Sequence, residues 1–171
     1  MSIDGATVPV TGTSWMDHEF GTSFLEAGQQ GWDWLSLQLN DGRELMLYQL
    51  RRADGSRDPH SSGTIVGRDG RTRHLTADDF SLTPAGRTLT ARSGATYPVA
   101  WRVTIPSEQV ALDVTTPLAD QELSSDASSG ITYWEGLIDV AGSAKGAPVR
   151  GRGYLEMTGY RGSLGRVLSS S

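Results

Sequence analysis

Hydrophobic and polar residues alternate along most of this chain, which is the pattern of β-strands with one buried face. Residues 32–39 read WDWLSLQL and place three leucines on one face, Leu35, Leu37 and Leu39. The other face carries Trp34, Ser36 and Gln38. Leucines usually form the core, but a polar stripe beside a tryptophan is also typical of a ligand cavity. The alternation alone leaves open which face lines the interior.

Two tight turns contain Asp-Gly, at residues 40–43 and 68–71. The glycine of such a turn supplies the positive φ that a short hairpin loop requires. Each turn joins two predicted strands, 32–39 with 44–52 and 62–66 with 72–75. Thr76 follows the second pair and is expected to cap a single helical turn.

Further strands are predicted at 80–83, 88–91, 99–105, 110–115, 131–140 and 149–160. The stretch 123–130 is rich in Ser, Asp and Ala and is predicted to be a mobile loop. About ten strands with almost no helix predict an all-β fold, an antiparallel up-and-down β-barrel of about 8–10 strands, because closing a sheet removes its exposed edges. A β-sandwich is the alternative architecture.

Size and composition fit a single domain over residues 1–171. The chain has 171 residues, 37% of them hydrophobic, which is enough for one substantial core. Its 21 glycines suit many turns between short strands. The net charge of −5 argues against a nucleic-acid-binding protein, because affinity for phosphate requires an excess of Lys and Arg.

The sequence also restricts the chemistry and the relation to membranes. Because the chain has no cysteine, it forms no disulfide and no thiolate metal site. No charged and apolar leader precedes Val8, and no apolar run approaches the roughly 20 residues of a membrane span. We therefore expect a soluble, non-membrane-spanning domain with no signal peptide in this sequence.

Four segments taken together resemble one protein family. They are GTSWMDHEFGTS at 12–23, GWDWLSLQLNDGRELMLYQLR at 31–51, ITYWEGLIDV at 131–140 and RGRGYLEMTGY at 150–160. In this order they resemble the C-terminal half of proteins of the AttH-like or carotenoid 1,2-hydratase-like family. The resemblance runs nearly end to end, from Val8 to about Gly162.

The resemblance implies a lipocalin-like (calycin-type) β-barrel that forms one of two halves. It also implies an apolar ligand, such as a carotenoid or another terpenoid, and no metal or other cofactor. Relatives hydrate an isolated alkene, hydrate a prenyl group or direct a pericyclic cyclisation, so the fold alone does not choose the reaction. The family's N-terminal half is missing from this sequence, so we expect either a separate partner half or a homodimer.

Hydrating an isolated alkene requires a proton donor strong enough to form a tertiary carbocation and a surface that stabilises the cation. A carboxylic acid in an apolar, aromatic pocket fits this role, because burial favours its neutral form. Strand spacing in WMDHE places Trp15, Asp17 and Glu19 on one face. We predict Asp17 as the proton donor and Glu19 as its partner or water activator. The alternative is a structural carboxylate bonded to Arg51, Arg102 or backbone amides.

Aromatic and polar side chains are the predicted ligand-binding residues, because apolar sites are commonly lined by aromatic rings. They are Trp15, His18, Trp34, Gln38, Tyr48, Trp134 and Glu135. The same aromatic residues are also ordinary in strand cores, and Glu135 is either a pocket carboxylate or, as we favour, a structural charge. A zinc site needs three or four ligands at defined spacing, so His18 does not predict a metal site.

Three functions remain open from the sequence. The first is a hydratase-like (lyase) domain that acts on an apolar, terpenoid-type alkene. The second is a non-catalytic module that binds a lipophilic molecule. The third is an isolated half of a two-domain enzyme. No GxSxG motif is present to support a serine hydrolase.

Overall fold

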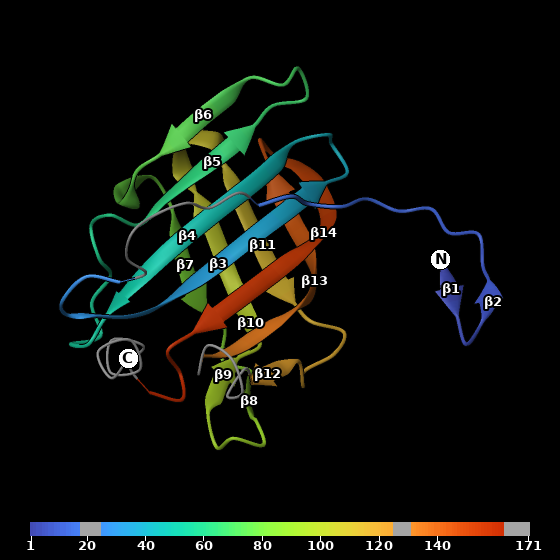
Figure 1. The fold of residues 1–171 in the computed structure, drawn as a ribbon. Helices are drawn as coiled ribbons and strands as arrows, with labels where there is room; N and C mark the ends of the chain where they lie inside the picture. Colours follow the sequence, from blue (N-terminus) through green and yellow to red (C-terminus); the bar gives the residue numbers. More distant parts are fainter. Residues whose placement is uncertain (18–24, 125–130, 163–171) are drawn as a thin grey trace.

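The computed structural model describes residues 1–17, 25–124 and 131–162, and this part of the chain is all-β (Figure 1). One antiparallel sheet contains β3 (Gln29–Leu39), β4 (Glu44–Arg52), β5 (Ser62–Val66), β6 (Thr72–Leu75), β7 (Ser81–Pro84), β10 (Ala100–Ile105), β11 (Val110–Thr115), β12 (Glu122–Ser124), β13 (Thr132–Ala144) and β14 (Ala147–Thr158). Two hairpins lie outside it, β1 (Ser2–Ile3) with β2 (Ala6–Thr7) and β8 (Thr88–Thr90) with β9 (Thr96–Pro98).

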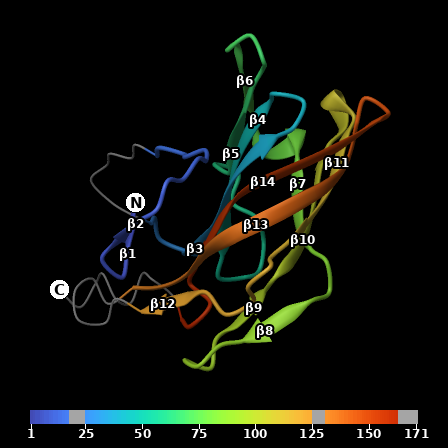
Figure 2. The ribbon, with the colours of Figure 1, turned by 90° about the vertical axis from the view of Figure 1, so that its right-hand side faces the viewer.

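The sheet follows the up-and-down order of the chain. The strand order is β6-β5-β4-β3-β14-β13-β11-β10-β7, with β12 paired to β13 beside this path. The first long strand, β3, therefore pairs with the last, β14. The edge strands β6 and β7 are joined by the short 3₁₀ helix η1 (Ala77–Asp79). Figures 1 and 2 show the sheet curled, so that β7, β10 and β11 lie behind β3, β4 and β14.

The structure confirms the all-β antiparallel prediction and both predicted hairpins. Gly42 lies in the first turn with φ of 84°, the left-handed conformation that the turn requires. Thr76 caps η1 as expected, in a capping box with Asp79. Part of the predicted loop at 123–130 is instead strand β12, and residues 125–130 of that prediction lie outside the described residues.

The predicted strand through Trp15 is wrong as far as the structure describes it. Residues 8–17 belong to no strand and run across the outer side of the sheet (Figures 1 and 2). The alternation of side chains still holds in this extended segment. Met16 is 85% exposed, whereas its neighbours Trp15 and Asp17 line a cleft against the sheet.

The leucine face of β3 forms the core. Leu35, Leu37 and Leu39 pack inside the curled sheet against side chains from β10, β11 and β13, among them Trp101 and Leu112. Each fully buried large apolar side chain contributes about 1.5–3 kcal/mol from its removal from water. These side chains fill the interior, and Trp34, Ser36 and Gln38 therefore lie on the outer face.

Gly153 explains how closely β14 approaches β3. A Cβ atom at this position would overlap the backbone carbonyl oxygen of Ser36. Any larger residue would force the two strands apart, which costs about 1–3 kcal/mol in a packed sheet. The absence of a side chain at this position therefore allows β14 to pair closely with β3. The candidate site lies on the outer side of this pair of strands.

An additional helix, η2 (Pro106–Glu108), precedes β11. None of the helices in the described part of the chain is long and apolar enough to cross a bilayer.

Candidate functional site

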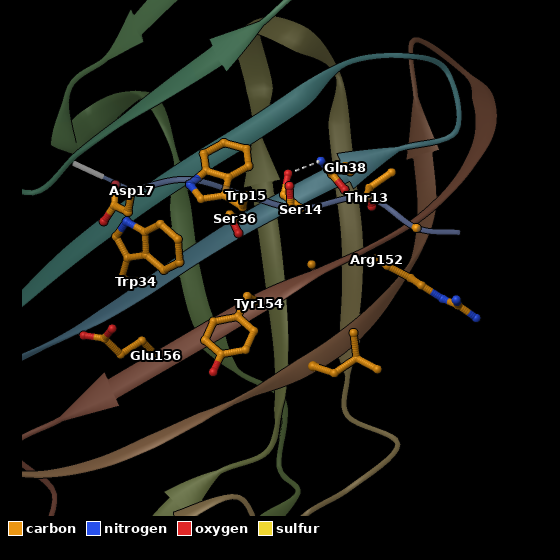
Figure 3. A pocket seen from close by; sticks show the side chains of 13 residues that line it. Thr13, Ser14, Trp15, Asp17, Trp34, Ser36, Gln38, Arg152, Tyr154 and Glu156 are labelled. Carbon is orange, nitrogen blue, oxygen red and sulfur yellow. Dashed lines mark hydrogen bonds between the residues drawn. The ribbon is translucent and has the colours of Figure 1, made fainter. Parts of the chain in front are cut away.

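A cleft of about 570 Å³ lies on the outer face of the sheet, between β3, β13, β14 and the segment 12–17 (Figure 3). Its volume falls within the range of small-molecule sites, roughly 300–1,000 Å³. The cleft is not the interior of the barrel, because the side chains that line it point away from the leucine core. The sequence left open which face of residues 32–39 lines a cavity, and in the structure Trp34, Ser36 and Gln38 line this outer cleft.

The floor of the cleft consists of cross-strand pairs between β3 and β14. Trp34 lies opposite Glu156 and Ser36 lies opposite Tyr154. Side chains that are directly opposite on one face of antiparallel strands have Cβ atoms about 4.5–5.5 Å apart. The two strands therefore bring an aromatic ring, a hydroxyl group, a phenol and a carboxylate onto one small surface. Leu137 of β13 continues this surface as the cross-strand partner of Tyr154.

The segment 12–17 forms the roof of the cleft. The Trp15 ring meets Trp34 edge to face, with ring centroids 6.3 Å apart and planes at 72°. Such edge-to-face pairs contribute about 0.5–1.5 kcal/mol beyond their buried area. The Gln38 amide Nε2 donates a hydrogen bond of 3.4 Å to the carbonyl oxygen of Ser14, drawn as a dashed line in Figure 3. One ring contact and one long hydrogen bond therefore hold this roof over the floor.

Two carboxylates line the cleft, Asp17 from the roof and Glu156 from β14. The Asp17 side chain is exposed, whereas Glu156 is half-buried and accepts a hydrogen bond of 2.6 Å from the indole Nε1 of the buried Trp32. Glu135 of β13 lies directly opposite Glu156 on the other side. Burial raises the pKa of the Tyr154 hydroxyl above its ordinary value, and the two glutamates raise it further. Tyr154 is therefore a neutral hydrogen-bond donor at physiological pH.

The structure brings together four of the residues that the sequence singled out. Trp15, Asp17, Trp34 and Gln38 all line the cleft. Tyr48 lies beside it as the cross-strand partner of Trp34, with its ring centroid 6.2 Å from that of Trp32.

Two further predicted residues, Trp134 and Glu135, do not belong to the lining. Trp134 points into the core, where it is 0% exposed and its Nε1 donates to the carbonyl oxygen of Ala119, so its burial has a structural reason. Glu135 lies on the outer face but outside the cleft lining. The predicted roles of His18 and Glu19 fall on residues outside those that the structure describes.

Sequence reasoning missed Glu156, Tyr154 and Arg152, which share the outer face of β14 and line the cleft. The alternation in RGRGYLEMTGY contains this information, because residues 152, 154 and 156 lie on the same side of a strand. What the alternation did not provide was the pairing of β14 with β3. That pairing joins segments more than 100 residues apart in the chain.

A second polar cluster lies on the inner face, at one end of the sheet. Asp33 is 0% exposed, accepts a hydrogen bond of 2.9 Å from the Tyr160 hydroxyl and lies 3.1 Å from the Arg51 Nε. Burial raises the pKa of Asp33, while Arg51 and the Tyr160 hydroxyl act in the opposite direction. The structural carboxylate bonded to Arg51, expected as the alternative role of Asp17, is therefore Asp33.

In the part of the chain that the structure describes, no group of three or more His, Cys, Asp or Glu side chains is arranged to hold a metal ion.

Comparisons of sequence and of structure both relate the chain to AttH proteins. A sequence model described as AttH-like matches residues 1–160. Among solved structures, a candidate AttH from Nitrosomonas europaea is 39% identical, with a TM-score of 0.71 over 81% of this chain and 41% of its own. Kievitone hydratase from Nectria haematococca is 24% identical, with a TM-score of 0.64 over 76% of this chain and 39% of its own. No curated protein matches the chain. The chain thus spans about two fifths of these two structures.

Proposed function

Because the chain belongs to the AttH-like family, we propose that it is a hydratase-like domain that binds an apolar, alkene-bearing molecule in the outer cleft. One observation carries the proposal: the rings of Trp15, Trp34 and Tyr154 and the carboxylates of Asp17 and Glu156 line a single cleft. Aromatic rings bind apolar molecules and stabilise a cation that forms over their faces. A terpenoid or carotenoid-type alkene is the substrate class that this combination suits.

The proposed reaction begins with proton transfer from Asp17 to one alkene carbon, which leaves a tertiary carbocation on the other carbon. Trp15 and Trp34 present π-systems to this cation, and a water molecule adds to it. An acid strong enough for the first step must be neutral, and exclusion of water from a carboxyl group favours that form. The Asp17 side chain is exposed in this chain. The proposal therefore needs a cover over the cleft when the substrate is bound.

We propose that a second lipocalin-like half, or a second copy of this chain, provides the cover. The two related structures are each more than twice as long as the part that this chain matches. Leu137 and Tyr154 expose apolar surface at the open side of the cleft. Light scattering of the chain distinguishes the two covers, because a second copy requires a dimer in solution and a separate half leaves a monomer.

The first prediction concerns Asp17→Asn. Binding should be retained, because the amide has the size of the carboxyl group, whereas hydration should fall by about 10²–10⁴-fold because the proton donor is lost. Quenching of tryptophan fluorescence measures binding of lycopene and of kievitone, and mass spectrometry measures the gain of one water. Unchanged hydration by Asp17→Asn would remove Asp17 from the mechanism.

The exposure of Asp17 favours one other function, a non-catalytic module that carries a lipophilic molecule. This module would bind the same probes in the same cleft. It would form no hydrate with either the wild-type chain or the variant, so the same experiment distinguishes it from the hydratase.

A further inference from the structure

The environment of Glu156 differs from that of Asp17 in ways that suit a different chemical role. Glu156 lies on β14, which is hydrogen-bonded to β13 on one side and to β3 on the other. Its position is therefore fixed by two neighbouring strands, whereas Asp17 lies on a segment with no strand partner. Groups held on regular elements are positioned more accurately than groups on loops.

The side chain of Glu156 is also oriented. Trp32 is buried, and its indole Nε1 donates a hydrogen bond of 2.6 Å to Oε1 of Glu156. An indole N–H donates only, so it stabilises the carboxylate by charge-assisted hydrogen bonding. An ionised carboxylate has no proton to donate and can accept one.

The two carboxylates of the cleft therefore differ in what they offer a substrate. Glu156 lies opposite Trp34, whose ring belongs to the aromatic floor on which the proposed cation forms. A water molecule that adds to this cation must lose a proton as its oxygen forms the new bond. A carboxylate at the edge of the floor is placed to receive that proton.

We propose that Glu156 is the base that takes this proton and that Trp32 is a positioning residue that orients it. The inference deepens the proposed function and rests on it. Asp17 gives its proton to the alkene carbon, the water oxygen bonds to the cationic carbon, and the released proton passes to Glu156. Solvent then returns a proton to Asp17 and removes one from Glu156, which restores both groups.

Deuterated water distinguishes the protonation of the alkene from the addition of water to the cation. Asp17 still protonates the alkene when Glu156 is Gln, and the cation then returns a proton to Asp17 instead of capturing water. We therefore expect Glu156→Gln to bind lycopene and kievitone normally, to incorporate deuterium into the recovered alkene and to lose about 10²–10⁴-fold in hydrate formation. Asp17→Asn should lose both deuterium incorporation and hydration.

Glu156→Gln is a mild change for the fold, because the amide oxygen still accepts the hydrogen bond from Trp32. Asp113→Asn is the matched control: Asp113 pairs with Arg102 on an exposed face of β11, so hydration should be unchanged. Trp32→Phe tests the positioning role. It should lower kcat for hydration and leave KM and deuterium incorporation unchanged, a separation that general destabilisation would not produce.

Two results with Glu156→Gln overturn the inference while the proposed function stands. Hydration at the wild-type rate removes Glu156 from the reaction, and loss of both hydration and deuterium incorporation shows that it is not the base. If the wild-type chain binds the probes but forms no hydrate, the proposed function itself fails, and the role of Glu156 fails with it. The wild-type measurement alone identifies that case.

Discussion

Asp58 is a buried carboxylate whose pKa is lowered by the hydrogen bonds that it accepts. It is 1% exposed, accepts hydrogen bonds from the backbone N–H of His60 and from Gln29 Nε2, and pairs with Arg52 at 2.9 Å. These donors, the His60 N–H first, lower the pKa of Asp58 to about 2. Asp33 is as deeply buried, but there the loss of water on burial is the largest effect and raises the pKa, although Arg51, Tyr160 and Gln49 act in the opposite direction.

The low pKa of Asp58 predicts a loss of stability in acid. The unfolded chain binds the proton near pH 3.8, whereas the folded protein binds it only near pH 2. The stabilisation from Asp58 is therefore complete above about pH 4 and is lost as the pH falls through this window. Urea denaturation of Asp58→Asn and the wild type should show a difference in the free energy of unfolding that shrinks from pH 4 to pH 2. A difference that stays constant over this window would contradict the assignment.

Individual site residues were predictable where side-chain alternation was sufficient. Trp15 and Asp17 fall together in the cleft although no strand contains them, because any extended chain alternates. Trp134 was not predictable in the same way. Its strand has a tryptophan face and a glutamate face, and only the position of the neighbouring strands shows that the tryptophan points inward.

At the scale of elements, β13 has a gap in its hydrogen bonding between β11 and β12. β11 pairs with residues 139–144 and β12 with residues 132–134. Gln121 fills the gap, because its side-chain Oε1 accepts from the Leu137 N–H at 3.2 Å and its backbone oxygen accepts from the Glu135 N–H at 3.1 Å. Thr116 Oγ1 contacts the Leu137 carbonyl at 2.9 Å. The side chain and backbone of Gln121 therefore provide the hydrogen bonds that a neighbouring strand would provide to β13 beside the cleft.

We therefore predict that Gln121→Met, which keeps the size of the side chain, destabilises the protein by about 0.5–1.5 kcal/mol because the backbone N–H of Leu137 loses its acceptor. Hydrogen exchange should locate the effect. The Leu137 amide should exchange faster, while the amide of Leu45, paired between β3 and β4, should change only with global stability. Equal acceleration at both amides would show that Gln121 has no local role.

The predicted elements match the observed ones where the turns are short. The Asp-Gly turn at 40–43 fixes the β3–β4 hairpin because its conformation allows few alternatives. The strand β12 was missed because three residues in a Ser-rich stretch carry too little alternation to detect. The spacing of residues 15–19 predicts a strand, whereas residues 15–17 belong to no strand. An extended segment and a strand have the same period, and only pairing distinguishes them.

At the scale of the whole molecule, the sequence predicted the curled antiparallel sheet, whose edge strands β6 and β7 do not pair to close it, but not the side of the sheet on which the candidate site lies. Alternation gives two faces, and a barrel of this size is just wide enough for its own side chains to fill. Leucines on β3 and the large rings of Trp101 and Trp134 fill this interior. The outer face, beneath the segment 12–17, carries the aromatic and charged residues that line the cleft.

The five tryptophans provide a direct test of this arrangement. Trp15 and Trp34 line the cleft, whereas Trp101 and Trp134 are buried in the core. Each indole N–H gives its own peak in a ¹⁵N-correlated NMR spectrum, and Trp→Phe variants assign the peaks. On titration with kievitone, the Trp15 and Trp34 peaks should move while the Trp101 and Trp134 peaks stay in place. Movement of the Trp101 and Trp134 peaks with Trp15 and Trp34 unchanged would place the ligand inside the sheet and contradict the outer cleft.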